Sequence, residues 1–381
     1  MADATRARTA TRISDAADER FMAAAIRYAM RHSGLTGTNP SVATLIVRDD
    51  GQGPRIVGRG ITALGGRPHA EAKALSEAGE KARGATAYVT LEPCAHHGRT
   101  PPCAEALVAA GVARVVSAAA DPDPRVDGKG HAILQAGGLA VRPRVMAREA
   151  ASDLAPYLAR HAKGRPHVTL KFAMSSDGCI GREGSGQVFI TGPTANRQTH
   201  LVRARTDAIL VGMGTVTEDD PSLECRLPGL AERSPRRIIL DPDLRMEPGL
   251  QLVRTARRTR TTLVTRADAD RAKRVALSDA GIDFVACAMV PGTTRVALPE
   301  LFEDLGAMGL QSVLVEGGAS VAASFLEAGL VDRLILVVGD LEIGPGGIAA
   351  PILFAEACER FHLRERLRFG ADRWFEFESR N

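Results

Sequence analysis

At 381 residues and 45% hydrophobic content, the chain is long enough to form two domains that each bury a core. Its 49 Lys and Arg residues nearly balance its 45 Asp and Glu residues, and a net charge of +4 argues against nucleic acid as a partner. No stretch is apolar and uncharged over the length of a membrane helix, so we expect a soluble protein that does not bind membranes.

The N-terminal segment 1–13 is polar and carries arginines without an apolar core, which favours a disordered tail over a targeting peptide. Ser14 is a suitable cap for a first helix, because apolar residues recur after it at helical spacing. The runs 41–47 and 55–60, separated by Asp-Asp-Gly at 49–51, are typical of a strand hairpin.

Strand and helix patterns then alternate along the first half. The predicted elements are a helix opening at 68–71, a strand at 87–91, a helix at 103–110, a strand at 113–119 and a helix that includes 132–136. This alternation indicates an α/β domain with parallel strands.

A polar break at 158–166 is suitable for a domain boundary, and a second alternation follows it. Strands are predicted at 167–173, 208–211, 237–240, 262–265, 312–315 and 333–338. Helices are predicted at 194–205, 267–279, 299–308 and 319–328. The second half is therefore also an α/β domain.

The strongest chemical pattern is His69-Ala-Glu71 followed by Cys94 and Cys103. One His and two Cys are the three protein ligands that a catalytic zinc uses while it keeps a position open for water. Bound zinc lowers the pKa of that water to about 7, and Glu71 beside it is able to carry a proton to a departing amine. The other cysteines are scattered and no secretory signal is evident, which indicates a reducing cytoplasm.

The remaining polar residues of this half carry weaker signals. His96, His97 and Arg99 lie between the two cysteines and are equally consistent with phosphate binding and with a solvated loop. Three further histidines have no other candidate ligand or catalytic residue at a typical spacing, and we interpret them as structural or surface residues: His131, His161 and His362.

Two glycine turns mark the second half. One joins the strand at 312–315 to the helix at 319–328, and the other, Gly-Met-Gly, follows the strand at 208–211. Each turn alone is equally consistent with phosphate binding at a helix N-terminus and with simple turn geometry. Together they favour a nucleotide site, although neither has the full dinucleotide fingerprint.

The run at 90–103, Thr-Leu-Glu-Pro-Cys-Ala-His-His-Gly-Arg-Thr-Pro-Pro-Cys, resembles the deaminase motif of the bifunctional riboflavin-biosynthesis deaminase/reductases. The eight residues between its cysteines depart from the two-residue spacing of the general zinc deaminase signature, but this long loop is itself typical of the family. Asn39-Pro40 and the run at 68–71 are also similar, and the resemblance extends over essentially the whole chain beyond the tail.

The resemblance implies a cytidine-deaminase-like zinc domain at 14–160 and a dihydrofolate-reductase-like, NADPH-dependent domain at 166–381. It also implies that Zn²⁺ is bound by His69, Cys94 and Cys103, with Glu71 as the catalytic proton shuttle. The implied substrate is a diamino-pyrimidinone ribosylamino 5′-phosphate, which is deaminated on the ring and then reduced at the ribose with NADPH. Whether the chain is a monomer or a homo-oligomer is left open.

Further residues match family positions. Those implied to bind substrate are Asn39, Lys171, Arg203, Leu223, Arg226 and Glu316. Those implied to bind the cofactor are Ala173, Phe189, Thr215, Asp219, Gly318, Ala319 and Ser320. Two departures affect the cofactor side: the chain has Gln187-Val-Phe189 where the family often has Ser-Gln-Trp, and Pro242 where a Ser is common.

Two other functions remain as alternatives. A zinc deaminase of nucleic-acid bases, with a C-terminal binding domain, is disfavoured by the balanced charge and by an aromatic content of 4%. A non-catalytic zinc-binding partner protein is disfavoured by Glu71, since a structural site needs no acid/base group.

Overall fold

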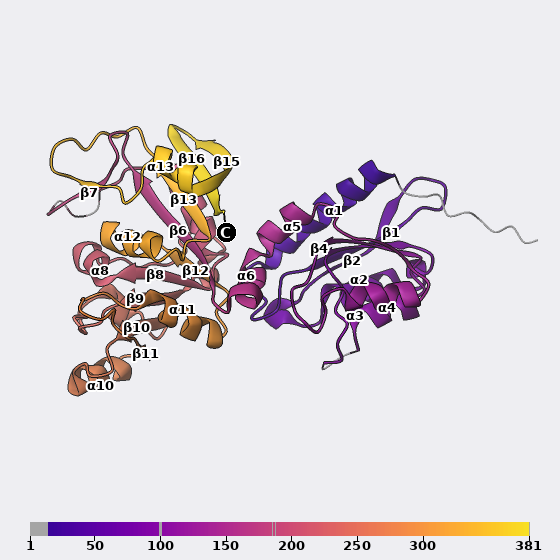
Figure 1. Ribbon diagram of the computed structural model, residues 1–381, viewed down its shortest axis with the longest axis horizontal. Helices are drawn as coiled ribbons and strands as arrows, with labels where there is room; N and C mark the ends of the chain where they lie inside the picture. The colour runs from indigo at the N-terminus through magenta and orange to yellow at the C-terminus, as the bar shows by residue number, and fades with distance from the viewer. Residues whose placement is uncertain (1–13, 99–100, 185, 187, 381) are drawn as a thin grey trace, which may run out of the picture. The chain divides into compact units, whose positions relative to one another are not determined.

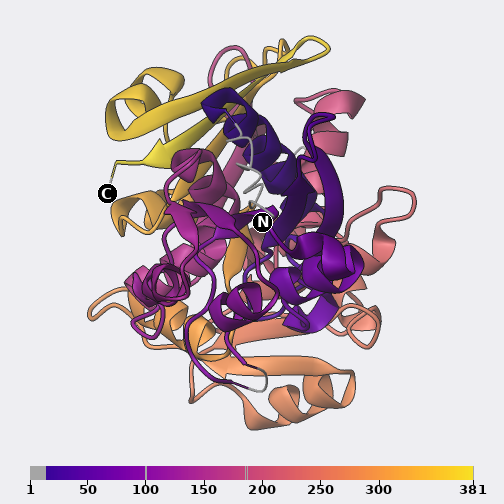
Figure 2. The ribbon, with the colours of Figure 1, turned by 90° about the vertical axis from the view of Figure 1, so that its right-hand side faces the viewer.

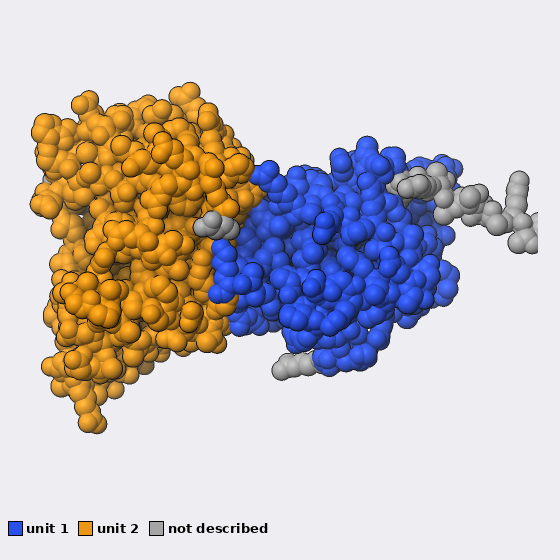
Figure 3. All heavy atoms as spheres, in the orientation of Figure 1, with its two compact units in different colours: residues 1–163 blue, residues 164–381 orange. Residues whose placement is uncertain are grey.

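The computed structural model describes residues 14–98, 101–184, 186 and 188–380. The chain divides into two compact units, residues 1–163 and 164–381, which are coloured separately in Figure 3. The expected disordered tail at 1–13 lies outside the described residues, as do Arg99 and Gln187.

The first unit is a five-stranded sheet between two layers of helices (Figures 1 and 2). Its main elements are α1 (Asp15–Ala29), β1 (Ala43–Arg48), β2 (Arg55–Ile61), α2 (Ala70–Ala78), β3 (Thr86–Leu91), α3 (Cys103–Ala109), β4 (Arg114–Ala119), α4 (Lys129–Ala136), β5 (Ala140–Arg142), α5 (Ala147–Asp153) and α6 (Ala155–Lys163). The strand order is β2-β1-β3-β4-β5, with α1 and α5 on one face and α2, α3 and α4 on the other (Figure 1).

Local sequence explains how α2 comes to lie against this sheet. Gly58 and Gly60 of β2 have no side chain, and a Cβ atom on Gly60 would lie 1.9 Å from the backbone oxygen of Ala70. Buried alanines, including Ala70 and Ala74, form the facing side of the helix. This pairing of glycine with alanine brings α2 very close to β2 and so fixes the position of His69 and Glu71 at its N-terminal end.

The second unit is built on a nine-stranded sheet of order β11-β10-β9-β8-β12-β6-β13-β16-β15. Its main elements are β6 (His167–Met174), β7 (Cys179–Arg182), α7 (Pro193–Arg203), β8 (Ala208–Gly212), α8 (Met213–Asp219), β9 (Arg236–Leu240), α9 (Gln251–Arg254), β10 (Thr261–Thr265), α10 (Arg271–Asp279), β11 (Ile282–Ala286), α11 (Leu298–Ala307), β12 (Ser312–Val315), α12 (Ala319–Glu327), β13 (Arg333–Val338), β14 (Gly347–Ala349), α13 (Phe354–Arg360), β15 (Phe361–Phe369) and β16 (Asp372–Ser379). The strands from β11 to β13 are all parallel, while β16 and β15 add an antiparallel hairpin at one edge.

The predicted hairpin is confirmed, since β1 pairs antiparallel with β2. The expected parallel strands are β3, β4 and β5, whereas β1 is also antiparallel to β3. The boundary between the two units falls within the polar segment at 158–166, whose residues 158–163 form the end of α6. The arginine, histidine and lysine that made it look like a break form the last turn of that helix, where positive charge is favourable.

Within the part of the chain that the structure describes, every helix is too short or too polar to cross a membrane.

Candidate active sites

The three expected zinc ligands come together in the first unit. His69 precedes α2, Cys94 lies in the loop after β3, and Cys103 is the first residue of α3. The Nδ1 atom of His69 is 3.8 Å from Sγ of Cys94 and 3.4 Å from Sγ of Cys103. Their ligand atoms all lie within 4.8 Å of one another, and the described residues contain no second such group.

The chemistry of this ligand set fits a zinc ion. Cys94 receives a hydrogen bond on its sulfur from the backbone N–H of Cys103 at 3.2 Å. Hydrogen bonding from Cys103 and His69 lowers the pKa of Cys94 to about 4, despite the opposing effect of burial. A thiolate is the form of cysteine that binds metal, and two sulfurs with one imidazole leave a tetrahedral zinc one open position.

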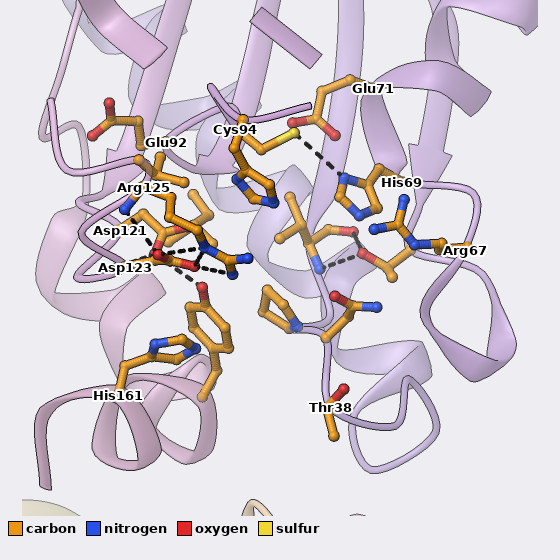
Figure 4. Close-up of a pocket in the computed structure, with 18 of the residues that line it drawn as sticks. Thr38, Arg67, His69, Glu71, Glu92, Cys94, Asp121, Asp123, Arg125 and His161 are labelled. Atoms are coloured by element: carbon orange, nitrogen blue, oxygen red, sulfur yellow. Dashed lines mark hydrogen bonds and ion pairs between the residues drawn. The ribbon is translucent and has the colours of Figure 1, made fainter. Parts of the chain in front are cut away.

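Glu71 lies beside this trio on the first turn of α2, with 4% of its surface exposed. Burial and the nearby Cys94 raise the pKa of its carboxyl group above the usual value. A carboxyl group whose pKa is moved toward neutrality is suited to taking up and releasing a proton. Figure 4 shows Glu71, His69 and Cys94 grouped at one side of the cavity that they line.

The cavity has a volume of about 380 Å³ and is lined from several elements. Asn39, which the family resemblance places against the pyrimidine, is among the lining residues, and its Nδ2 donates to the backbone oxygen of Gly66 at 3.3 Å. His96 also lines the cavity, whereas His97 is exposed and lies 3.6 Å from Glu105.

A polar cluster on the opposite side of this cavity has no counterpart among the residues selected from the sequence (Figure 4). Asp121 accepts a hydrogen bond from the Tyr157 hydroxyl at 2.9 Å, and Asp123 accepts two hydrogen bonds from Nε of Arg125 at 3.0 Å each. Burial raises the pKa of Asp121. The only sequence signal was Asp-Pro-Asp-Pro directly after a buried strand, a position where parallel strands often place functional side chains.

His161 is exposed, as expected of a surface residue. It also lines the cavity and packs against Tyr157 with ring centroids 4.5 Å apart. His131, by contrast, is structural: its Nε2 lies 2.8 Å from the Ser117 hydroxyl and its Nδ1 lies 3.6 Å from Glu92.

The second unit has a larger cavity, of about 480 Å³, at the carboxyl ends of its parallel strands. It lies beyond β8 and β12, where the two predicted glycine turns lead into α8 and α12. Ligands of open parallel sheets bind at this edge. The predicted residues that line it are Lys171, Ala173, Phe189, Thr215, Asp219, Glu316, Gly318 and Ala319.

Charges are paired at the base of this cavity. Arg203 forms a bidentate ion pair with Glu316, with Nε–Oε1 and Nη2–Oε2 distances of 2.9 and 2.7 Å. Burial alone would raise the pKa of Glu316, but the charge and hydrogen bonds of Arg203, with the nearby Lys171 and His200, outweigh it and the pKa is lowered. Lys171 lies partly buried beside them, and burial lowers the pKa of its ammonium group.

Four other predicted residues do not line the cavity. Arg203 touches it only through Glu316, and Ser320 is exposed on α12. Leu223 is buried with a φ of +54°, a conformation that non-glycine residues seldom adopt. Arg226 lies in the same loop and is exposed. Arg203 donates a hydrogen bond to the backbone oxygen of Glu224 in this loop, at 3.1 Å.

Phe189 stands where the family often has a tryptophan. Its side chain lines the cavity and is 72% exposed, which is unusual for a large apolar residue. An exposed aromatic ring at the mouth of a cavity is well placed to cover a flat ligand ring.

Comparison with known proteins gives one result for each unit and one for the whole chain. Residues 15–119 match the cytidine and deoxycytidylate deaminase zinc-binding region, and residues 166–367 match the RibD C-terminal domain. The riboflavin biosynthesis protein RibD of Escherichia coli is 39% identical over 339 residues, which cover 86% of this chain and 89% of that protein.

Solved structures agree over both units. RibD of Acinetobacter baumannii has a TM-score of 0.82 and 34% sequence identity, covering 97% of this chain and 100% of that one. A deaminase/reductase of Thermotoga maritima has a TM-score of 0.81 and 28% identity, covering 95% and 98% of the two chains. The chain therefore belongs to the RibD family of bifunctional riboflavin-biosynthesis enzymes, with a zinc-binding deaminase domain followed by a reductase domain.

Proposed function

We propose that the first unit deaminates a diamino-pyrimidinone ribosylamino 5′-phosphate and that the second reduces the ribosyl group of the product to ribityl with NADPH. The Thermotoga maritima relative is described as a diaminohydroxyphosphoribosylaminopyrimidine deaminase and 5-amino-6-(5-phosphoribosylamino)uracil reductase. The observation that carries the proposal is the grouping of His69, Cys94 and Cys103 beside the buried Glu71 in one cavity.

In the deaminase site, His69, Cys94 and Cys103 hold the metal and Glu71 moves the proton. When bound, zinc makes a water-derived nucleophile available at neutral pH. Glu71 takes a proton from the attacking water and delivers it to the departing amine, so that the ring carbon exchanges an amino group for oxygen and ammonia leaves. Burial of the carboxyl group excludes bulk water from this transfer.

Asn39 lines the same cavity and presents an amide, which is able to pair with the polar edge of a pyrimidine. Its Nδ2 is already tied to the Gly66 carbonyl, so the orientation of the amide is set before a ligand binds. This preorganisation supports its assignment to substrate binding.

In the reductase site, NADPH supplies a hydride and the protein supplies placement. The backbone around Gly318 and Ala319 lies at the N-terminus of α12, where free N–H groups favour a phosphate. Lys171 and Glu316 lie at the base of the cavity and are suited to contact the substrate. Arg203 and Arg226 are the arginines that we assign to the ribose phosphate.

Mass spectrometry of the products provides the test. The full chain is incubated with the diamino-pyrimidinone phosphate, first alone and then with NADPH. We expect loss of an amino group in both reactions and addition of two hydrogens only with NADPH. Absence of deamination by a zinc-loaded, folded protein would refute the proposed substrate, whereas reduction that proceeds equally well with NADH alone would refute the assigned cofactor.

A further inference from the structure

The segment at 221–226, which we name the substrate loop, contains no helix or strand. Hydrogen bonds to other parts of the unit nevertheless fix most of its residues. The backbone oxygen of Ser222 accepts a hydrogen bond from the buried Arg237 at 3.3 Å. The backbone oxygen of Glu224 accepts one from Arg203 at 3.1 Å. The backbone N–H of Cys225 donates to the Ser234 hydroxyl at 3.1 Å.

The last residues of the substrate loop are both bonded to one residue of α7, His200. The backbone N–H of Arg226 donates to Nδ1 of His200 at 3.4 Å, and the Cys225 thiol donates to the backbone oxygen of His200 at 3.4 Å. His200 precedes Arg203 by one helical turn, so both residues reach the loop from the same face of α7. One face of this helix thus links the loop to Glu316 at the base of the cavity.

These contacts matter because the substrate loop is strained. Leu223 is buried with φ at +54° and Asp220, just before the loop, has φ at +38°. Non-glycine residues in this region cost free energy and persist only where surrounding contacts hold them. Since Arg226 itself is exposed, its side chain has little packing of its own to fix it.

We infer that His200 is a positioning residue of the reductase: by accepting the Arg226 N–H, it fixes the end of the substrate loop and directs Arg226 toward the phosphate of the substrate. The inference rests on the proposed assignment of Arg226 to the ribose phosphate. His200 does not touch substrate or cofactor in this arrangement, and it acts only through the backbone of Arg226.

The surroundings of His200 favour the neutral ring that this role needs. The ring is partly buried, and Arg203 on its own helix and Arg226 on the loop are both cations. These effects lower the pKa of His200, against the opposing influence of Glu316 after β12 and of the Glu224 carbonyl. A neutral imidazole keeps one ring nitrogen free to accept a hydrogen bond, whereas a protonated ring does not.

Substitutions at His200 separate this role from general packing. His200→Leu keeps an apolar body but removes the acceptor. His200→Asn restores an acceptor, because its Oδ1 stands at the same bond distance from the backbone as Nδ1 of histidine. His200→Gln places its acceptor where Nε2 lies and is the mismatched control. Arg197→Ala, an exposed residue of the same helix, controls for changes in α7.

Steady-state kinetics of the reductase and amide hydrogen exchange of the substrate loop are measured on the full chain. For His200→Leu we expect the KM for the phosphorylated substrate to rise about 3- to 10-fold, the scale of one lost hydrogen bond. We expect kcat and the KM for NADPH to stay within about twofold, and the Arg226 amide to exchange faster. His200→Asn should restore both values, and His200→Gln should not.

Four outcomes test the inference. Unchanged exchange of the substrate loop in His200→Leu, or equal behaviour of the Asn and Gln variants, overturns the inference. In a double-mutant cycle, His200→Leu should add no further loss to Arg226→Ala, and an additive loss also overturns it. If Arg226→Ala leaves the substrate KM unchanged while His200→Leu still loosens the loop, the proposed phosphate role of Arg226 fails and the structural role of His200 stands.

Discussion

Glu71 has the most sharply defined role of any single residue. Its carboxyl group is buried beside the proposed zinc ligands and its pKa is raised, which suits it to exchange a proton. We expect Glu71→Gln to bind zinc normally but to lose about 100- to 10,000-fold in deamination rate, since an amide does not shuttle protons. Metal analysis and single-turnover deamination of the full chain measure the two effects.

The same change at Glu77 provides the matched control. Glu77 lies on the same helix, its side chain is 47% exposed, and it accepts a hydrogen bond from the Arg59 N–H that a glutamine is able to preserve. Glu77→Gln should deaminate at the normal rate. Near-normal deamination by Glu71→Gln would show that another group carries the proton.

The two arginines assigned to the substrate phosphate should differ in their effect on stability. Arg203 pairs with Glu316, whose side chain is only 11% exposed, so Arg203→Ala leaves a mostly buried carboxylate without this partner and should cost about 3 kcal/mol of unfolding free energy. Arg226 is exposed, so Arg226→Ala should change stability by less than about 0.5 kcal/mol while weakening substrate binding. Urea unfolding and substrate KM for each variant test this. Equal destabilisation by the two changes would contradict it.

At the residue scale, the sequence predicts what short motifs encode and misses what only the fold assembles. His69, Cys94 and Cys103 were selected because their types and order match a zinc site, and the structure brings them together. Asp121 is marked only by the run Asp-Pro-Asp-Pro after a buried strand, and Tyr157 carries no motif. They meet only because α6 returns to the end of β4, a contact that no local pattern specifies.

At the scale of single elements, the packing of α2 against β2 sets the geometry of the proposed zinc site. Since a Cβ on Gly60 would lie 1.9 Å from the Ala70 oxygen, Gly60→Ala must push the N-terminus of α2 away from the sheet. We expect a loss of about 1–3 kcal/mol in stability from overpacking, together with weaker zinc retention against a chelator. Gly249→Ala, where a Cβ has open space, should do neither. If Gly60→Ala is destabilised but retains zinc normally, the packing of α2 against β2 does not control metal binding.

Asp332 joins β13 to β6 in the second unit and makes its stability depend on pH. Burial would raise its pKa, but hydrogen bonds from Arg165 and Val168 and the charges of His167 and Arg165 lower it to about 2, from 3.8. A lowered pKa stabilises the folded state above pH 3.8, and this stabilisation, about 2 kcal/mol, is lost as the pH falls toward 2. Urea unfolding between pH 6 and pH 2 should show a shallower acid decline for Asp332→Asn than for the unchanged protein. An identical decline would contradict this assignment.

Elements with a strong periodic pattern were predicted well, and those stabilised mainly by tertiary contacts were not. The predicted strand at 312–315 matches β12, and the predicted helix at 319–328 matches α12 within one residue. The β15–β16 hairpin was missed. Charged residues interrupt the alternation of β15, and its partner strand is anchored by Trp374, which is completely buried against other elements.

At the scale of the whole molecule, every proposed zinc-site group lies in one unit and every proposed reductase group in the other. Each unit has its own sheet and its own buried apolar cluster. The chemistries share no group, since one replaces an amino group on a ring carbon and the other transfers a hydride to a sugar carbon. We therefore expect the two activities to be lost independently.

Paired variants test this independence. Glu71→Gln should abolish deamination and leave reduction of previously deaminated substrate intact. Glu316→Gln should do the converse; the neutral glutamine keeps hydrogen-bonding groups next to Arg203 and Lys171, so it disturbs the buried cluster less than alanine would. An equimolar mixture of the two variants should restore the overall conversion, because the deaminated intermediate is able to diffuse from one chain to another. Loss of both activities from either single change in a folded protein would refute separate sites. A mixture that deaminates but never reduces would show instead that the intermediate must stay on one chain.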